Sequence, residues 1–316
     1  GFIGSNLAFY FQKNYPKAKV VVLDCFRTGE TFSNGNLKSF GHFKNLLGFK
    51  GVVISGDIND KKLLKNLEKN YKFDYIFHQA AISDTTVSEQ DLIIKTNVNA
   101  YEDLLKIAIK HKANIIYASS AATYGNSDKF EVGCEKPNNA YGFSKVMMDN
   151  ITAEYLKKDL EISIVGLKYF NVYGPREFFK NKTASMVVQF GHQILKGLTP
   201  KLFEGSDKIL RDFIYIEDVI QANIKASNPK KSGVYNVGTG CARSFEDIVN
   251  ILQNELEINN GKEYIPNPYV GSYQFFTEAN IETTKKYLDY EPRFSMEDGI
   301  KAYIPEIKRL FQEEVK

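Results

Sequence analysis

GFIGSNLAFYFQKNYPKAKVVVLDCF, residues 1–26, joins two glycines, an apolar helix pattern and an apolar strand pattern that runs up to an acid. Gly1 and Gly4 stand where a strand-to-helix turn lets a pyrophosphate approach the backbone, and the helix N-terminus then offers free N–H groups and partial positive charge. Asp24 follows Gly4 by about 20 residues, the spacing at which an acid binds an adenosine ribose. The stretch predicts a dinucleotide-binding α/β fold.

The glycine pattern begins abruptly. Gly1 and Gly4 match the second half of G-x-x-G-x-x-G, and the strand and first glycine that should precede them are absent from the sequence. In such a fold that strand lies at the centre of the sheet, so we expect about ten further residues ahead of Gly1 in the natural protein. An intact mass of the natural protein that begins at Gly1 would contradict this.

Short apolar runs alternate with helical patterns through the first half. The strand patterns are Lys19–Phe26, Val52–Ser55, Tyr75–His78, Asn114–Ser120 and Ile162–Tyr169, and the helical patterns include Asp91–Lys112 and Tyr141–Lys158. Runs that are apolar on both faces are typical of a parallel sheet covered by helices on each side. The sequence therefore predicts a Rossmann-like, doubly wound parallel sheet.

The regular alternation of strand and helix patterns ends after Tyr169. Gly174 and Pro175 open a polar, lysine-rich stretch to Lys182, which predicts a loop. We expect residues 1–169 to form a dinucleotide-binding domain and residues 170–316 to form mainly a smaller substrate-binding lobe. Residues 212–236 contain a strand-and-helix pattern that we expect to return to the first domain.

Composition excludes several classes of protein. The chain has 316 residues, 43% hydrophobic, with 41 Lys and Arg against 38 Asp and Glu and no basic block, which argues against a nucleic-acid partner. Cys25, Cys134 and Cys241 are widely spaced, which suits a reducing cytoplasm and suggests neither a disulfide framework nor a metal site. Apolar runs stay below the roughly 18 residues of a membrane span. We expect a cytoplasmic protein without a membrane partner.

Tyr141 and Lys145 stand four residues apart on a predicted helix and share one face. A cationic lysine near a phenol favours the phenolate, which brings tyrosine toward the working range of an acid/base. On spacing alone, the pair is equally consistent with a solvated helix face. Ser120 decides for catalysis because it ends a predicted strand, where ligands bind in open parallel sheets. Its hydroxyl there can hold an oxygen that is being oxidised while Tyr141 moves the proton.

Motifs spread over nearly the whole chain resemble the extended short-chain dehydrogenase/reductase family. They are GFIG (1–4), HQAA (78–81), SSAATYG (119–125), YGFSK (141–145), FNVYGP (170–175) and RDFIYIEDV (211–219). The resemblance implies that Ser120, Tyr141 and Lys145 are catalytic. It implies a cofactor site formed by Phe2, Ile3, Gly4, Asp24, Cys25, Gln79, Ala80, Ala81, Ile82, Ser83, Asn97, Lys145 and Val172.

Two alanines that follow Ser120 narrow the range of possible reactions. The nucleotide-sugar dehydratases that resemble this chain carry Asp-Glu just after the strand-end Ser/Thr, and these places hold Ala121 and Ala122 here. Without those carboxylates there is no obvious acid for expelling water. The resemblance therefore favours epimerisation of a nucleotide sugar over dehydration.

Within the family, the chain is similar to the epimerases that act on ADP-linked heptoses. The similarity lies in SSAATYG, in FNVYGPRE followed by Lys180 and ASM (184–186), and in KLFEGS (201–206) ahead of Arg211. It implies inversion of C6 of ADP-D-glycero-D-manno-heptose to the L-glycero epimer, for lipopolysaccharide core synthesis, by a homo-oligomer. Lys180 would serve with Tyr141 as a second acid/base, with Lys182 as the alternative. The implied substrate-binding residues are Asn171, Lys182, Gln189, Phe203, Glu204, Gly205, Ser206, Arg211 and Tyr273.

The residues themselves leave the nicotinamide cofactor open. Asp24 suits the free 2′-hydroxyl of NAD, whereas Arg27, Lys61 or Lys62 suits the 2′-phosphate of NADP. Thr31 stands where the similar epimerases carry a lysine that helps hold this phosphate, and the segment 33–50 is longer than usual. The resemblance favours NADP over NAD.

The implied mechanism oxidises C6 transiently, turns the ketone over and reduces its other face with the same bound NADP, which requires proton transfer at two places. A UDP-hexose 4-epimerase or another nucleotide-sugar oxidoreductase is the alternative enzyme. A dinucleotide-sensing module is the alternative without catalysis, and the presence of both Tyr141 and Lys145 argues against it.

Overall fold

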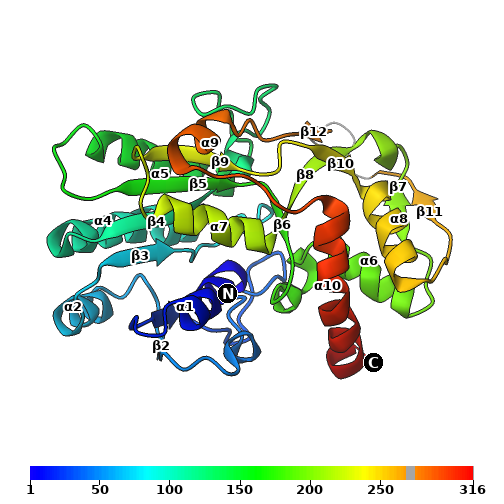
Figure 1. Cartoon of the computed structure of the whole chain (residues 1–316), viewed down its shortest axis with the longest axis horizontal. Coiled ribbons are helices and arrows are strands. Elements are labelled where there is room, and N and C mark those ends of the chain that lie inside the picture. Colours follow the sequence, from blue (N-terminus) through cyan, green and yellow to red (C-terminus); the bar gives the residue numbers. More distant parts are fainter. Residues whose placement is uncertain (268–274, 316) are drawn as a thin grey trace.

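The computed structural model describes residues 1–267 and 275–315 (Figure 1). The helices are α1 (Phe2–Asn14), α2 (Lys61–Asn70), α3 (Gln90–Ile93), α4 (Ala100–His111), α5 (Ala140–Tyr155), α6 (Met186–Leu195), α7 (Ile216–Ala226), α8 (Phe245–Leu256), α9 (Glu282–Leu288) and α10 (Met296–Leu310). The strands are β1 (Val21–Asp24), β2 (Val52–Ser55), β3 (Tyr75–His78), β4 (Asn114–Ser120), β5 (Ile164–Tyr169), β6 (Asn171–Tyr173), β7 (Lys201–Phe203), β8 (Leu210–Tyr215), β9 (Gly233–Val237), β10 (Ala242–Ser244), β11 (Glu263–Ile265) and β12 (Phe276–Thr277). Short helical turns used below are η2 (Ile94–Asn99), η3 (Ala121–Thr123), η4 (Phe178–Thr183) and η5 (Ser206–Lys208).

The predicted parallel sheet is present in two hydrogen-bonded parts. Strands β3, β4, β5 and β9 pair in that order, all parallel, and β1 pairs in parallel with β2. Three of the predicted strands have the predicted bounds, whereas the ladders of β1 and β5 begin two residues later than their apolar runs. The predicted fold class, an α/β fold with a parallel sheet and flanking helices, is confirmed.

Helices cover both faces of the β3–β4–β5–β9 sheet (Figure 1). Val219 of α7 packs in one apolar cluster with Val165 of β5, next to α1. Met148 of α5 packs in a second cluster with Ile164 of β5, next to α4. Because side chains alternate between the two faces of a strand, Lys168 of β5 lies on the same face as Ile164, toward α5.

The second half of the chain builds a smaller lobe beside this sheet. Strand β8 pairs with β6, β10 and β12, and helices α6, α8 and α10 pack together next to it (Figure 1). Strands β7 and β11 form a separate parallel pair. One apolar cluster extends from β4 and β5 through α7 and β8 into α6, α8 and α10, so the two lobes share a core.

Two segments differ from the simplest sequence expectation. Within residues 212–236, α7 packs against α1 and β5 and β9 pairs with β5, whereas β8 pairs with strands of the smaller sheet. We predicted a loop for the polar stretch to Lys182, but residues 178–183 of this stretch form the helical turn η4. The buried carboxylate of Glu177 organises it by accepting hydrogen bonds from the N–H groups of Gly174 and Ser185.

The cysteines are free thiols, with Cys25 and Cys241 exposed and Cys134 partly buried. Over residues 1–267 and 275–315, no group of three or more His, Cys, Asp and Glu side chains is arranged to hold a metal ion. The helices of the same residues are all too short or too polar to cross a membrane.

Candidate active site

The carboxyl ends of the parallel strands meet at one edge of the fold. Strand β1 ends at Asp24, β3 at His78, β4 at Ser120 and β5 at Tyr169, and the register places Ser120 beside Tyr169. This is the edge at which open parallel sheets bind ligands. Residues from distant parts of the sequence that were predicted to act together therefore come to one place.

A close approach between α5 and the turn after β4 brings Tyr141 to Ser120. Asn139 caps α5 by accepting a 2.8 Å hydrogen bond from the N–H of Gly142. A Cβ on Gly142 would lie 2.4 Å from the carbonyl oxygen of Ala122, so a glycine is needed for the first turn of α5 to come this near. The Ser120 side chain lies near enough to the Tyr141 phenol to oppose part of the rise that burial causes in the pKa of that phenol.

Lys145 follows one helical turn after Tyr141 and is 1% exposed. Its Nζ donates a 2.6 Å hydrogen bond to the carbonyl oxygen of Ala118 and lies 5.8 Å from the ring centroid of Tyr141. Burial lowers the pKa of Lys145 to about 8, and the carboxylate of Asp149 opposes this shift. A lysine in this place can give up or take a proton near neutral pH.

Tyr141 is a proton donor in its resting state. Burial raises the pKa of the Tyr141 phenol, and the Ser120 side chain opposes only part of the rise. The phenol therefore keeps its proton at neutral pH. It becomes a base only when a neighbouring cation favours the phenolate, which is what the Lys145 ammonium supplies.

The N-terminus of α1 fits the pyrophosphate of a dinucleotide. Its N-cap, Gly1, makes no side-chain capping bond, and its first turn contains no acid. Unused N–H groups and the helix dipole favour a phosphate there. Phe2 is buried in the core, whereas Ile3 and Gly4 are partly exposed.

Asp24 faces this helix end. Its Oδ2 lies 2.6 Å from the backbone nitrogen of Gly1, and its Oδ1 accepts a 2.9 Å hydrogen bond from the N–H of Phe26. Cys25 is exposed, and its Sγ lies 3.3 Å from the hydroxyl oxygen of Ser39. The acid thus stands at a strand end beside the helix N-terminus, as the spacing predicts for a ribose contact.

Gln79 and the four residues after it follow β3 toward the same helix end. The Gln79 amide donates to Oδ1 of Asn223 and accepts from the hydroxyl of Tyr169, both at 3.1 Å. A Cβ on Gly4 would lie 3.8 Å from the Cβ of Gln79. Beyond Gln79, Ala80 and Ser83 are exposed and Ala81 and Ile82 are partly buried.

Asn97 lies behind the segment that follows β3. It is fully buried in the π-helical turn η2, and its amide accepts from the N–H of Ile82 at 2.9 Å and donates to the carbonyl oxygen of Ile82 at 3.0 Å. The same amide donates to the hydroxyl of Ser144 at 2.9 Å. These contacts tie the segment after β3 to α5, so Asn97 holds Ile82 and Ser144 in place beside the predicted cofactor site.

His78 presents an unused polar atom at the ligand edge. Its ring is buried and stacks on Tyr101 with centroids 6.0 Å apart, and its Nε2 has no hydrogen-bond partner within the described part of the chain. Burial, and then the ammonium of Lys145, lowers the pKa of His78 to about 3, so the ring is neutral. A buried nitrogen of this kind fits a group supplied by a bound cofactor.

The structure separates the two candidates for the second acid/base. Lys180 in η4 is partly buried, and its Nζ lies 5.8 Å from the ring centroid of Phe2 at the start of α1. Burial lowers the pKa of Lys180, with the Glu177 carboxylate opposing the shift. Lys182 is exposed. Lys180 is thus the lysine that lies next to the candidate cofactor site.

Asn171, Val172 and Gln189 lie where β6 and α6 border the first sheet. Asn171 is exposed and Val172 partly buried on β6, which pairs with β8. The Gln189 side chain donates a 2.7 Å hydrogen bond to the carbonyl oxygen of Ala184 and a 3.4 Å bond to that of Lys182. Gln189 therefore helps to hold the segment that carries both lysines.

The remaining predicted substrate residues lie on β7, η5 and β8. Phe203 is partly buried, and Glu204 and Gly205 are exposed. Ser206 is 2% exposed, and its hydroxyl has no hydrogen-bond partner among the described residues. Arg211 is buried on β8 and donates to the carbonyl oxygen of Leu210 at 2.9 Å. The last of the predicted residues, Tyr273, lies outside the described residues.

Of the three cations considered for a 2′-phosphate, Arg27 follows Asp24 most closely along the chain, three residues after the end of β1. Its guanidinium donates to the carbonyl oxygens of Phe40 and Phe179, and its Nε is buried without a partner in the described residues. The exposed Lys61 and Lys62 begin α2, and Thr31 is also exposed.

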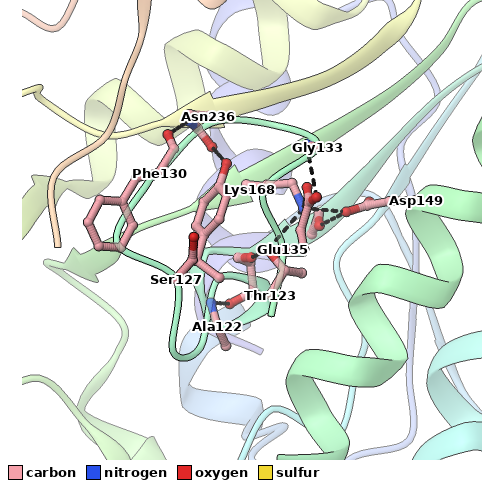
Figure 2. A network of polar contacts seen from close by, with 12 residues as sticks. Ala122, Thr123, Ser127, Phe130, Gly133, Glu135, Asp149, Lys168 and Asn236 are labelled. Atoms are coloured by element: carbon pink, nitrogen blue, oxygen red, sulfur yellow. Dashed lines mark hydrogen bonds and ion pairs between the residues drawn. The ribbon is translucent and has the colours of Figure 1, made fainter. Parts of the chain in front are cut away.

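Sequence reasoning missed a polar network on the α5 face of the sheet (Figure 2). The ammonium of Lys168 lies 2.6 Å from the carboxylate of Asp149 and 3.1 Å from that of Glu135. Signals for it exist in the sequence: Asp149 continues the four-residue spacing of Tyr141 and Lys145, and Lys168 is a lone cation in an apolar strand run.

Comparison with known proteins agrees with this geometry. Residues 1–238 match the NAD dependent epimerase/dehydratase family. The chain is 36% identical over 312 residues to the ADP-L-glycero-D-manno-heptose-6-epimerase of Brachyspira hyodysenteriae, which spans 96% of this chain and 94% of that protein. The solved ADP-L-glycero-D-manno-heptose-6-epimerase of Helicobacter pylori is similar with 52% identity and a TM-score of 0.87, over 98% of this chain and 93% of that one. The UDP-glucose 4-epimerase of Thermotoga maritima, solved with UDP-glucose, is similar with 26% identity and a TM-score of 0.85, over 99% and 97%. On its sequence, its sheet and the groups gathered at the sheet edge, the chain belongs to the NAD dependent epimerase/dehydratase family.

Proposed function

We propose that this chain inverts C6 of ADP-D-glycero-D-manno-heptose to give ADP-L-glycero-D-manno-heptose, a step of lipopolysaccharide core synthesis. The observation that carries the proposal is the contact between Tyr141 and Ser120 at the ligand edge, with the buried Lys145 behind it. The substrate follows from the two similar proteins, at 36% and 52% identity, that are ADP-heptose 6-epimerases.

Tyr141, Lys145 and Ser120 act on the C6 hydroxyl on one side of the sugar. A nicotinamide held at this edge would supply the hydride acceptor for C6 and the hydride donor for its opposite face. Tyr141 enters this step as the phenolate, which the Lys145 ammonium stabilises, and it takes the hydroxyl proton as C6 is oxidised. The Ser120 hydroxyl donates a hydrogen bond to the same oxygen and stabilises the negative charge that develops on it.

Inversion needs a second proton-transfer group, because the two faces of the transient ketone present their oxygen to different places. Lys180 is suited to this role because burial lowers the pKa of its ammonium, which makes proton donation easier. Its segment is fixed by Glu177, so its position is defined before the substrate binds. Lys182, which is exposed, is assigned to substrate binding.

The second lobe supplies the contacts for the nucleotide sugar. Arg211 suits a diphosphate because its planar guanidinium can bond two oxygens at once. The hydroxyl of Ser206, buried and without a partner among the described residues, suits a substrate oxygen. In this proposal residues 1–169 hold mainly the dinucleotide and residues 170–316 hold mainly the sugar nucleotide.

NADP is the proposed cofactor, within a family that is NAD dependent by description. Arg27, with its unpartnered Nε, is the cation that would contact a 2′-phosphate, while Asp24 contacts the ribose. Mass spectrometry of the nucleotide that co-purifies shows whether the 2′-phosphate is present. Arg27→Ala should weaken NADP binding more than NAD binding, and equal losses for both would contradict the assignment.

Incubation with ADP-D-glycero-D-manno-heptose and, separately, with UDP-glucose tests the function, with both epimers followed by NMR. We expect epimerisation of the ADP-heptose only. Turnover of UDP-glucose alone would identify a hexose 4-epimerase instead. Retention of the parental rate by both Tyr141→Phe and Lys180→Ala would contradict the mechanism.

Two further properties belong to the proposal. We propose a homo-oligomer, which light scattering coupled to size-exclusion chromatography measures directly. A cytoplasmic location is proposed because the three cysteines are free thiols, which suits a reducing compartment.

A further inference from the structure

Lys168 is a buried cation whose ammonium has more than one anionic partner. It is 0% exposed on β5, and its Nζ lies 2.6 Å from Oδ2 of Asp149 and 3.1 Å from Oε1 of Glu135 (Figure 2). The hydroxyl of Thr123 is a third partner at 2.9 Å, and the ring of Tyr124 lies 5.4 Å away. A buried lysine with this many partners is held in one position, because each contact would have to break for it to move.

The partners belong to different parts of the site. Asp149 is on α5, one turn beyond Lys145, and it also accepts hydrogen bonds from Tyr117 at 2.8 Å and Ser119 at 2.9 Å on β4. Thr123 and Glu135 belong to residues 121–139, which connect the end of β4 to the start of α5. Lys168 therefore joins the catalytic helix to the connection that precedes it.

That connection has Ser120 at one end and Tyr141 at the other. Close to Ser120, Thr123 donates its hydroxyl to the Ser120 carbonyl oxygen at 2.8 Å. Close to Tyr141, Glu135 receives the N–H of Gly133 at 2.8 Å, which shapes the return of the chain to α5. Holding Thr123 and Glu135 to one ammonium thus fixes the distance between the two catalytic hydroxyls.

Lys168 also balances charge close to Lys145. Asp149 raises the proton affinity of Lys145, and Lys168 is the cation that offsets this carboxylate. The charged and titratable groups that face this region include Asp149 and Tyr141 on α5, Tyr124, Cys134 and Glu135 on the connection, His78 on β3, Tyr117 on β4, and Tyr101 on α4. Loss of the Lys168 charge makes the local potential more negative, whereas loss of the Glu135 charge makes it more positive.

We infer that Lys168 is a positioning residue of the epimerase: it holds Asp149 and the connection 121–139 so that Ser120 and Tyr141 meet, and it neutralises Asp149 beside Lys145. The inference rests on the proposed function only in the roles of Ser120, Tyr141 and Lys145. It adds a residue that touches neither substrate nor cofactor.

Three variants separate the mechanical role from the electrostatic one. Lys168→Met removes the charge and keeps the length of the side chain, Lys168→Arg keeps the charge, and Glu135→Gln removes a negative charge on the other side of the ammonium. Lys230→Met is the matched control, because Lys230 forms an exposed ion pair with Asp289 on the surface. Circular dichroism and thermal unfolding establish that each variant is folded.

The first readout needs no turnover: the titration of Lys145, followed by NMR of labelled lysine side chains and assigned with Lys145→Met. We expect the Lys145 midpoint to rise by about 0.5–1 pH unit in Lys168→Met and to fall in Glu135→Gln. Lys168→Arg and Lys230→Met should leave it near the parental value. A purely structural role would not produce shifts of opposite sign.

The second readout is the pH profile of epimerisation. We expect kcat of Lys168→Met to fall about 10- to 100-fold with a much smaller change in KM, because misplaced hydroxyls affect the chemical step. The pH profile of kcat for Lys168→Met should move to higher pH together with the pKa of Lys145. Lys168→Arg should have the pH profile of the parent protein.

The inference would be overturned if the Lys145 titration were unchanged in Lys168→Met and Glu135→Gln, or if it shifted in the same direction in both variants. If Lys168→Met does not fold, Glu135→Gln and Lys168→Arg decide it. A parent protein that fails to epimerise ADP-heptose would instead refute the proposed function, because the Lys145 titration does not depend on turnover.

Discussion

Glu177 accepts two hydrogen bonds from Ser185, one from its backbone N–H at 2.6 Å and one from its hydroxyl at 2.8 Å. These bonds close the segment that carries Lys180. Two non-glycine residues of the segment have positive φ, Arg176 at 75° and Asn181 at 54°. Such backbone conformations each cost on the order of 1–3 kcal/mol and persist only where the surroundings hold them. In this segment, the carboxylate of Glu177 holds the backbone in place through its hydrogen bonds.

Replacement of Glu177 by alanine should therefore affect both stability and catalysis. The N–H groups of Gly174 and Ser185 would lose their acceptor inside the protein, so we expect the free energy of unfolding to fall by about 2–4 kcal/mol. We also expect kcat to fall, because Lys180 would no longer be held. Chemical denaturation and steady-state kinetics measure the two effects. Glu154→Ala, which removes an exposed ion pair with Lys157, should change stability by less than about 1 kcal/mol. Equal effects of the two substitutions would show that Glu177 has no special role.

Tyr141→Phe should remove catalysis and leave the fold intact. The ring is retained and only the hydroxyl is lost, so we expect kcat to fall by about 10²–10⁴-fold while thermal unfolding changes little. Tyr155→Phe, at the other end of α5, is the control for loss of a tyrosine hydroxyl from the same helix. A Tyr141→Phe protein with the activity of the Tyr155→Phe protein would rule out Tyr141 as the acid/base.

The two lysines of the second-lobe segment should behave differently. Lys180 is partly buried beside α1 and Lys182 is exposed, so Lys180→Ala should lower kcat by about 10²-fold or more. Lys182→Ala should act mainly on KM, since an exposed cation contributes to substrate binding without a defined place at C6. Kinetics with ADP-heptose compare the pair. A larger loss of kcat in Lys182→Ala would move the second acid/base to Lys182.

Lys145 should destabilise the folded protein at neutral pH. Its pKa is about 8 in the folded chain, below the value of about 10.4 for an unfolded lysine, so the unfolded state binds more protons between these values. The destabilisation is therefore full below pH 8 and disappears as the pH rises through the unfolded pKa. We expect Lys145→Met to be inactive and, at pH 7, more stable than the parent by about 1–3 kcal/mol.

Denaturant unfolding at several pH values checks this expectation, and the difference between the two proteins should shrink from pH 8 to pH 10.5. A Lys145→Met protein that is less stable than the parent at pH 7 would show that the hydrogen bond from Lys145 to Ala118 outweighs the cost of burying the charge.

Much of the fold could be predicted because its signals are local. A strand of a covered parallel sheet is apolar on both faces, and such runs have recognisable ends, which is why β2, β3 and β4 begin and end where predicted. The spacing of Tyr141 and Lys145 is also local, since helix geometry alone places them on one face. The prediction of a loop to Lys182 was wrong at η4 because its cause, the buried Glu177, acts through contacts that spacing does not reveal.

The sequence by itself determined the kind of fold and the glycine-started helix α1, because helix and strand periodicities and turn glycines act over a few residues. It also supplied the residues that we propose for the chemistry. The tertiary structure decided which of those residues meet. The approach of Gly142 to Ala122 sets Tyr141 against Ser120, and the ammonium of Lys168 joins β5, α5 and the connection between β4 and α5. Each of these depends on packing between segments that are separated along the chain, and the burial that shifts the pKa of Lys145 exists only once those segments have come together.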